Sequence, residues 1–200
     1  MLNSRILIRC CCIAFSTLLF ILSSCSSPVR VLDYWTSEDF RDYSKKSFVV
    51  AVKADDPANR QLFEDRIADK MDNGRIEAIT SYTVLPDQVI TNLDEFLNSN
   101  QSLLDSLGIR GVVFAAVKNV IISDKPGEQA SEKQKQDPEN SPLSRTYVLE
   151  SRIIDLKRSP DNQLVGVNLV SITDPTSADK LVSRYSKVVS KHFKKSPSNE

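Results

Sequence analysis

The sequence is poor in the residues on which most catalytic and metal sites depend. Its 200 residues include one histidine, four cysteines and five glycines. One imidazole leaves little for a metal site of the Cys–His type or for a His-dependent catalytic triad. No two glycines are spaced as in the phosphate-binding G-x-G-x-x-G or Walker motifs, and no serine lies in a G-x-S-x-G motif. These absences predict a protein that has no cofactor, no metal and no enzymatic activity.

An excess of charge of one sign is also missing. The chain has 26 basic and 26 acidic residues, so no basic field is available to recruit nucleic acid. Hydrophobic residues make up 40% and charged residues 26% of the sequence. This balance argues against both a disordered chain and a polytopic membrane protein. The length of 200 residues fits one folded domain.

The first 25 residues carry the most specific motif of the chain. Two arginines, Arg5 and Arg9, precede an uncharged apolar run from Cys10 to Leu22. This arrangement is typical of a signal peptide, and the run is shorter than the roughly 20 apolar residues of a membrane-spanning helix. Leu22-Ser23-Ser24-Cys25 then resembles the bacterial lipobox, in which small residues admit the peptidase and the cysteine accepts diacylglycerol. The motif predicts removal of residues 1–24 and lipidation of Cys25.

The cysteine count supports lipidation over a secreted, disulfide-bonded domain. Cys10, Cys11 and Cys12 would be removed with the signal peptide, so Cys25 would be the only cysteine left and could form no intrachain disulfide. Ser26, which follows Cys25, resembles the residue found there in Gram-negative lipoproteins exported to the outer membrane. We therefore expect a lipoprotein anchored in the outer membrane by acyl chains, palmitate among them, with its domain facing the periplasm.

Residues 25–46 are predicted to form a tether between the anchor and the domain. This segment is rich in aromatic residues for a linker: Tyr34, Trp35, Phe40 and Tyr43. One interpretation is that the rings pack on the edge of the domain or lie among lipid headgroups. The other is that they bind a protein partner, because Trp and Tyr are frequent at binding hot spots.

Residues 47–195 are predicted to form one α/β domain. The order β-α-β-α-β-β-β-α predicts a mixed sheet of about five strands, with the first three parallel, the last hairpin antiparallel, and helices on both faces. The polar stretch 123–142 is expected to be a mobile loop, and 196–200 a disordered tail. The expected strands are 47–54, 76–84, 112–122, 145–156 and 164–172, and the expected helices begin at Pro57, at Thr91 or Asn92, and after Asp174-Pro175.

Adjacent carboxylates occur in the predicted helices, but their positions do not favour acid–base catalysis. Asp55-Asp56 and Asp94-Glu95 lie at predicted helix N-termini, where capping explains them. Glu64 and Asp65 are neighbours within a helix and therefore point in different directions. His192, near the end of the last predicted helix, is interpreted as a surface residue next to the negative end of the helix dipole.

Two sequence segments resemble segments of bacterial envelope protein families. The stretch from Val31 to Phe48 is similar to the opening of many small uncharacterised outer-membrane lipoproteins, and Leu103 to Ala115 resembles the helix–glycine–strand phrase of periplasmic α/β lipoproteins. The curli-secretion and penicillin-binding-protein-activator lipoproteins share this order of elements. The resemblance implies an α/β fold and an envelope role without catalytic residues. Residues 123–142 are too polar for the membrane-spanning hairpins of the curli-secretion family, so pore formation is not expected.

The function hypotheses follow from these observations. The first is a lipid-anchored protein that binds an envelope protein as a scaffold, assembly factor or activator. The alternative is a ligand-binding or carrier lipoprotein, which needs an apolar cavity large enough for a lipid or glycan. A hydrolase with an unrecognised site is the remaining possibility.

Overall fold

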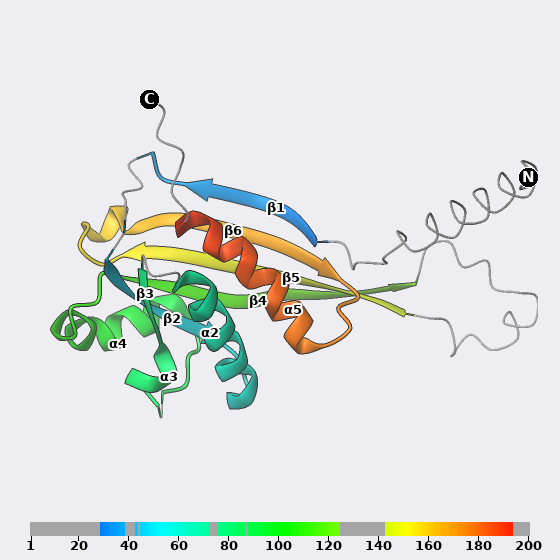
Figure 1. Ribbon diagram of the computed structural model, residues 1–200, viewed down its shortest axis with the longest axis horizontal. Coiled ribbons are helices and arrows are strands. Elements are labelled where there is room, and N and C mark those ends of the chain that lie inside the picture. Colours follow the sequence, from blue (N-terminus) through cyan, green and yellow to red (C-terminus); the bar gives the residue numbers. More distant parts are fainter. Residues whose placement is uncertain are drawn as a thin grey trace, which may run out of the picture.

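The computed structural model describes residues 29–38, 43, 45–72, 76–86, 88–124 and 143–193. It contains one six-stranded sheet, and the predicted single-domain, mixed α/β class is confirmed. The strands are β1 (Val29–Thr36), β2 (Lys46–Lys53), β3 (Ile76–Thr80), β4 (Gly111–Asp124), β5 (Leu143–Asp155) and β6 (Leu164–Thr173). Their order across the sheet is β1-β6-β5-β4-β2-β3 (Figure 1).

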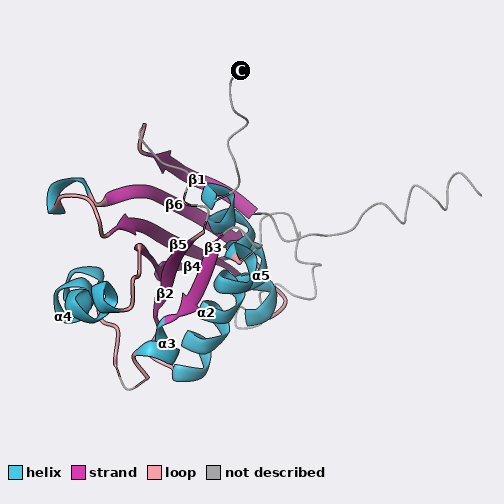
Figure 2. Cartoon of the chain, turned by 60° about the vertical axis from the view of Figure 1, so that its left-hand side comes forward, coloured by secondary structure: helices cyan, strands magenta, loops and turns pink. Residues whose placement is uncertain are grey.

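The helices cover both faces of the sheet, and α2, α3 and α4 connect its parallel strands. The helices are α2 (Pro57–Met71), α3 (Ser81–Val84), α4 (Leu93–Ser106) and α5 (Ala178–Val189), with 3₁₀ turns η3 (Pro160–Asn162) and η4 (Ser190–Phe193). As predicted, β2 is parallel to β3 and β4, and β5 and β6 extend the sheet antiparallel; the antiparallel pair of β6 with β1 was not predicted. Helices α2 and α5 lie on one face and α4 on the other (Figure 2).

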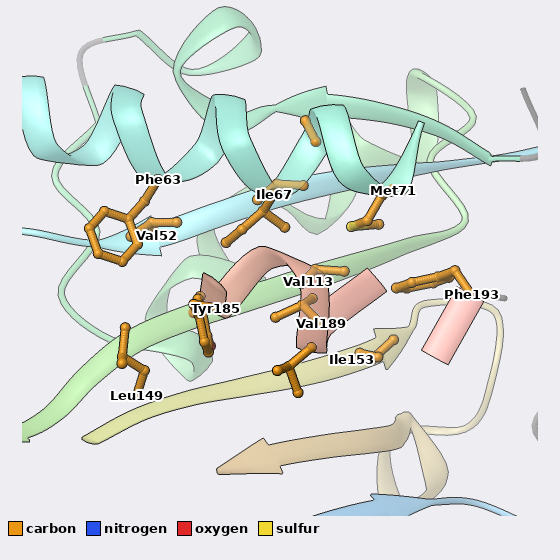
Figure 3. Close-up of a cluster of buried hydrophobic side chains, with 14 of the residues drawn as sticks. Val52, Phe63, Ile67, Met71, Val113, Leu149, Ile153, Tyr185, Val189 and Phe193 are labelled. Atoms are coloured by element: carbon orange, nitrogen blue, oxygen red, sulfur yellow. The ribbon is translucent and has the colours of Figure 1, made fainter. Parts of the chain in front are cut away.

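Each face of the sheet carries its own hydrophobic core. The core under α2 and α5 is the larger, and Figure 3 shows side chains of both helices meeting those of β2, β4 and β5. Burying one such side chain contributes about 1.5–3 kcal/mol. The larger core includes Phe48, Val50, Ile67, Met71, Val113, Ile153, Val189 and Phe193, and the core under α4 includes Val49, Ala51, Phe96, Leu104, Val112 and Phe114.

Strand β1 was not among the five expected strands, and it shows that the prediction of a tether over residues 25–46 is partly wrong. Residues 29–36 of that segment pair antiparallel with β6 instead of linking loosely to the domain. Five of the eight residues, Val-Arg-Val-Leu-Asp-Tyr-Trp-Thr, are β-branched or aromatic, which favours a strand. The pairing register shifts between Val31 and Asp33, so a bulge interrupts the period-two pattern that identifies strands in a sequence.

One of three element boundaries agrees with expectation and two differ. The second expected strand, 76–84, ends at Thr80, and α3 follows. Helix α4 begins after Asn92, one of the two expected starts, and Asn92 accepts a hydrogen bond from the Glu95 N–H at 2.8 Å. Helix α5 is capped by Ser177, which accepts from the Lys180 N–H at 3.2 Å, not by Asp174-Pro175.

Several predicted features lie outside the described residues. They are the signal peptide 1–24, the lipidation site Cys25, Phe40, most of the loop 123–142, the tail 196–200 and the side chain of His192. Within the described part of the chain, no helix is both long enough and apolar enough to cross a membrane.

Candidate functional site: an edge strand and an apolar cavity

The edge strand β1 exposes large apolar side chains on both faces. Tyr34 lies opposite Asn168 and Trp35 opposite Val167 on β6, so the two rings point to opposite sides of the sheet. Tyr34 remains 46% exposed and Trp35 44% exposed. Val29, Val31 and Leu32 are exposed as well. The structure thus places two of the four predicted partner-binding aromatics on one exposed strand.

Tyr43 does not belong to that surface, so its interpretation as a partner-binding residue is wrong and the alternative, packing on the domain, holds for it. Its side chain is only 4% exposed and packs edge-on against Phe48, with ring centroids 5.2 Å apart. The hydroxyl donates to Asp155 Oδ2 at 3.1 Å. Burial and the neighbouring Asp155 carboxylate raise the pKa of Tyr43 to about 12, against the opposing effects of Arg158 and Arg110. Tyr43 therefore stays protonated and acts as a structural donor.

A depression of about 700 Å³ lies beside Trp35 and is lined by charged side chains of both signs. They are Arg110, Lys157, Arg158 and Asp161. The buried carboxylate of Asp155 accepts from Arg110 at 2.7 Å and from Arg158 at 3.3 Å. Lys157 is paired with Asp105 at 2.6 Å, so carboxylates compensate most of the positive charge beside Trp35.

A second buried carboxylate, Glu64, joins α2 to the sheet. It accepts hydrogen bonds from Arg60 Nε at 2.9 Å, from Ser81 Oγ at 2.6 Å, and from the N–H groups of Val52 and Tyr82 at 3.1 and 3.0 Å. All of its bonds are internal, which is the arrangement of a structural group. Its neighbour Asp65 is exposed and accepts from the Tyr82 hydroxyl at 2.6 Å. The prediction that these adjacent carboxylates diverge is confirmed.

An apolar cavity of about 490 Å³ lies between α2, α5 and the sheet. Its volume is within the range of about 300–1,000 Å³ typical of small-molecule sites. No sequence motif pointed to it, because its walls come from five separate segments. The lining residues include Val52 and Ala54 at the carboxyl end of β2, Phe63 of α2, Val117 and Val120 of β4, Tyr147 and Leu149 of β5, and Leu181 and Tyr185 of α5.

Tyr185 lies between this cavity and the sheet, and its hydroxyl points away from open space. The residue is fully buried, and the hydroxyl has almost no accessible surface and no hydrogen bond of standard geometry among the described residues. Burial raises the pKa of Tyr185, and the nearby Ser151 lowers it by a smaller amount. The Ser151 hydroxyl itself accepts from Asn168 Nδ2 at 2.9 Å. Tyr185 therefore contributes to the packing under the cavity and offers no polar contact within it.

Comparison with known proteins gave structural likenesses only. No protein-family model matches the chain, and a search of curated proteins found no match. The PelC dodecamer from Paraburkholderia phytofirmans is 13% identical, with a TM-score of 0.47 over 85% of this chain and 99% of that one. Lipoprotein GNA1162 from Neisseria meningitidis is 13% identical, with a TM-score of 0.40 over 74% of this chain and 97% of that one. At these TM-scores the likeness assigns neither a function nor an assembly state. The resemblance to the curli-secretion and penicillin-binding-protein-activator lipoproteins stays a prediction.

Proposed function

We propose that this chain is an outer-membrane lipoprotein that acts by binding a periplasm-facing protein partner, which adds a strand to the edge of β1. The observation that carries the proposal is the exposed, apolar edge strand that begins four residues after Cys25. Four residues span at most about 14 Å. A lipid anchor at Cys25 would therefore hold β1 close to the membrane surface, where other envelope proteins are concentrated.

The exposed edge is unusual for a strand that has no binding role. Natural proteins protect edge strands with charges, proline, bulges or a covering segment, because an edge presents backbone donors and acceptors to other chains. Strand β1 contains neither lysine nor proline; its protection is limited to Arg30, Asp33 and the bulge between Val31 and Asp33, and its first seven side chains are exposed. An extended peptide that pairs with such an edge gains affinity from main-chain hydrogen bonds and specificity from alternate side chains. Trp35, a residue type frequent at hot spots, would then contribute one of the side-chain contacts to the partner strand.

A role in binding rather than turnover is part of the proposal. The two most deeply buried carboxylates, Glu64 and Asp155, are each occupied by internal hydrogen bonds. They hold the fold together and offer no open position to a substrate. Hydrolysis of an envelope glycan or peptide by the purified chain, with turnover, would contradict this part.

The anchor is tested by Cys25→Ser, which removes the predicted lipid acceptor. We expect an unprocessed or soluble periplasmic chain, because serine offers no thiol for the thioether bond. Membrane fractionation and the mass of the amino-terminal peptide measure the outcome. A Cys25→Ser chain that is cleaved normally and remains in the outer-membrane fraction would exclude lipid anchoring at this residue.

The edge is tested by Leu32→Lys, which places a charge on β1. In cells, a photoreactive amino acid in place of Tyr34 should crosslink a protein. Leu32→Lys should lower the yield of this crosslink at least tenfold, since an edge lysine opposes strand addition.

Trp35→Ala should weaken the same complex by about 2 kcal/mol if the ring is a hot spot. Leu32 and Trp35 are both exposed, so melting temperatures should barely change.

The matched control is Leu107→Lys, at the end of α4. Leu107 is 48% exposed and Leu32 is 52% exposed, so the two substitutions differ in location more than in burial. The control should leave the crosslink intact. Equal yields from the two lysine variants would remove β1 from the binding surface.

The alternative function, binding of a small ligand, is favoured by a separate observation, the apolar cavity of about 490 Å³. A carrier of a lipid or glycan needs an apolar cavity of sufficient size, and this cavity lies in the size range of small-molecule sites. The two functions use different parts of the domain and do not exclude each other.

A further inference from the structure

The topology of the sheet places the apolar cavity where α/β sheets bind ligands. From β2 the chain crosses through α2 to β3 on one side, and it then returns through α4 to β4 on the other side. The strand order therefore reverses between β2 and β4, and ligands of open α/β sheets bind at the carboxyl ends of the strands at such a switch point. The cavity is lined by Val52 to Asp55, at the carboxyl end of β2, and by Ala116 and Val117 of β4.

The lining of the cavity favours a molecule without net charge. Its walls are mainly aliphatic and aromatic, and only two lining residues carry formal charge, Lys53 and Asp55. The N-terminus of α2, which would otherwise attract an anion, is already capped, since Asp56 Oδ1 accepts from the Ala58 N–H at 3.0 Å. An anionic ligand would find one lysine and two nearby carboxylates, and a cation would meet Lys53.

We propose that the cavity binds a neutral, mainly apolar small molecule, which gives the chemical class of the ligand for the alternative function. The ligand is a single-chain or fused-ring compound, because the cavity holds about 490 Å³. The site is independent of β1, so its failure would leave the proposed protein-binding function untouched.

The proposal is tested by titrating the purified full chain with Nile red, a neutral apolar dye that has a carbonyl oxygen and fluoresces in apolar surroundings. The blocking variant is Ala178→Trp, at the mouth of the cavity, and the matched control is Ala58→Trp. Both alanines are exposed first-turn residues, of α5 and α2, but Ala58 does not line the cavity. Dye bound elsewhere on the chain is common to both variants and cancels in the comparison.

We expect Ala178→Trp to weaken dye binding at least tenfold relative to Ala58→Trp. Dodecanol should displace the dye at lower concentration than dodecanoate, because the two differ mainly in the charge of the head. Equal binding by the two tryptophan variants would overturn the cavity as the site. Stronger displacement by dodecanoate would overturn the assignment of a neutral ligand.

Discussion

Replacing Glu64 with alanine is expected to lower the free energy of unfolding by about 4 kcal/mol, because removal of one partner from a buried ion pair leaves the other charge uncompensated. Arg60, the partner that remains, is only 7% exposed. The substitution also strands the N–H groups of Val52 and Tyr82. Strand β3 pairs with β2 only as far as Val50, so Glu64 takes the place of the missing strand at Val52. Urea unfolding followed by circular dichroism measures the change.

The control for Glu64 is its neighbour Asp65. Asp65→Ala removes an exposed hydrogen bond to the Tyr82 hydroxyl and should cost less than about 1 kcal/mol. The two substitutions remove the same charge one residue apart on the same helix. If their costs were equal, the Glu64 cluster would not be the link between α2 and the sheet.

Replacing Gly111 with alanine is expected to destabilise the fold by about 3 kcal/mol or more, through overpacking. A Cβ at this position would lie 2.3 Å from the Ile154 carbonyl oxygen and 2.5 Å from the ring of Phe48. Neither can retreat, since Ile154 is part of β5 and Phe48 is fully buried between Tyr43 and Phe193. The melting temperature should fall by about 6–12 °C.

Gly108 provides the matched glycine. It lies at the end of α4 with φ of +72°, and a Cβ there would meet no atom within 4 Å. Gly108→Ala should therefore cost only the left-handed backbone penalty of about 1–2 kcal/mol. A Gly111→Ala chain as stable as the Gly108→Ala chain would show that β4 and β5 can separate at Gly111 without loss of packing.

The parallel part of the fold was predictable because its signals are local. Asp56 and Pro57 mark the start of α2, and the apolar run after Gly108 marks strand β4. Such a run favours a strand covered on both faces, but only the first five residues of β4 are buried and residues 117–124 are exposed. Right-handed crossovers then fix the neighbours of β2. The antiparallel edge was less predictable, since the bulge at Leu32 shifts the alternation of β1 and hides the strand.

The candidate sites depend on contacts that no local pattern contains. Tyr43 and Trp35 looked alike in the sequence, but Tyr43 meets Asp155, 112 residues away, and is buried, whereas Trp35 stays exposed on β1. The cavity likewise joins α2 and α5, which are separated by more than 100 residues, over the reversal point of the sheet. Residue types suggested binding, and only the assembled fold divided the aromatics between core and surface.

Backbone hydrogen–deuterium exchange tests strand addition at β1 most directly. It is measured by mass spectrometry on the chain alone and on its complex with the protein identified by crosslinking. In an antiparallel pair alternate residues bond to the neighbour, so about half of the β1 amides point away from β6. We predict that these amides of residues 29–36 exchange at least tenfold more slowly in the complex, with little change in α4. Protection elsewhere on the domain, with β1 exchanging at its free rate, would contradict the proposed function.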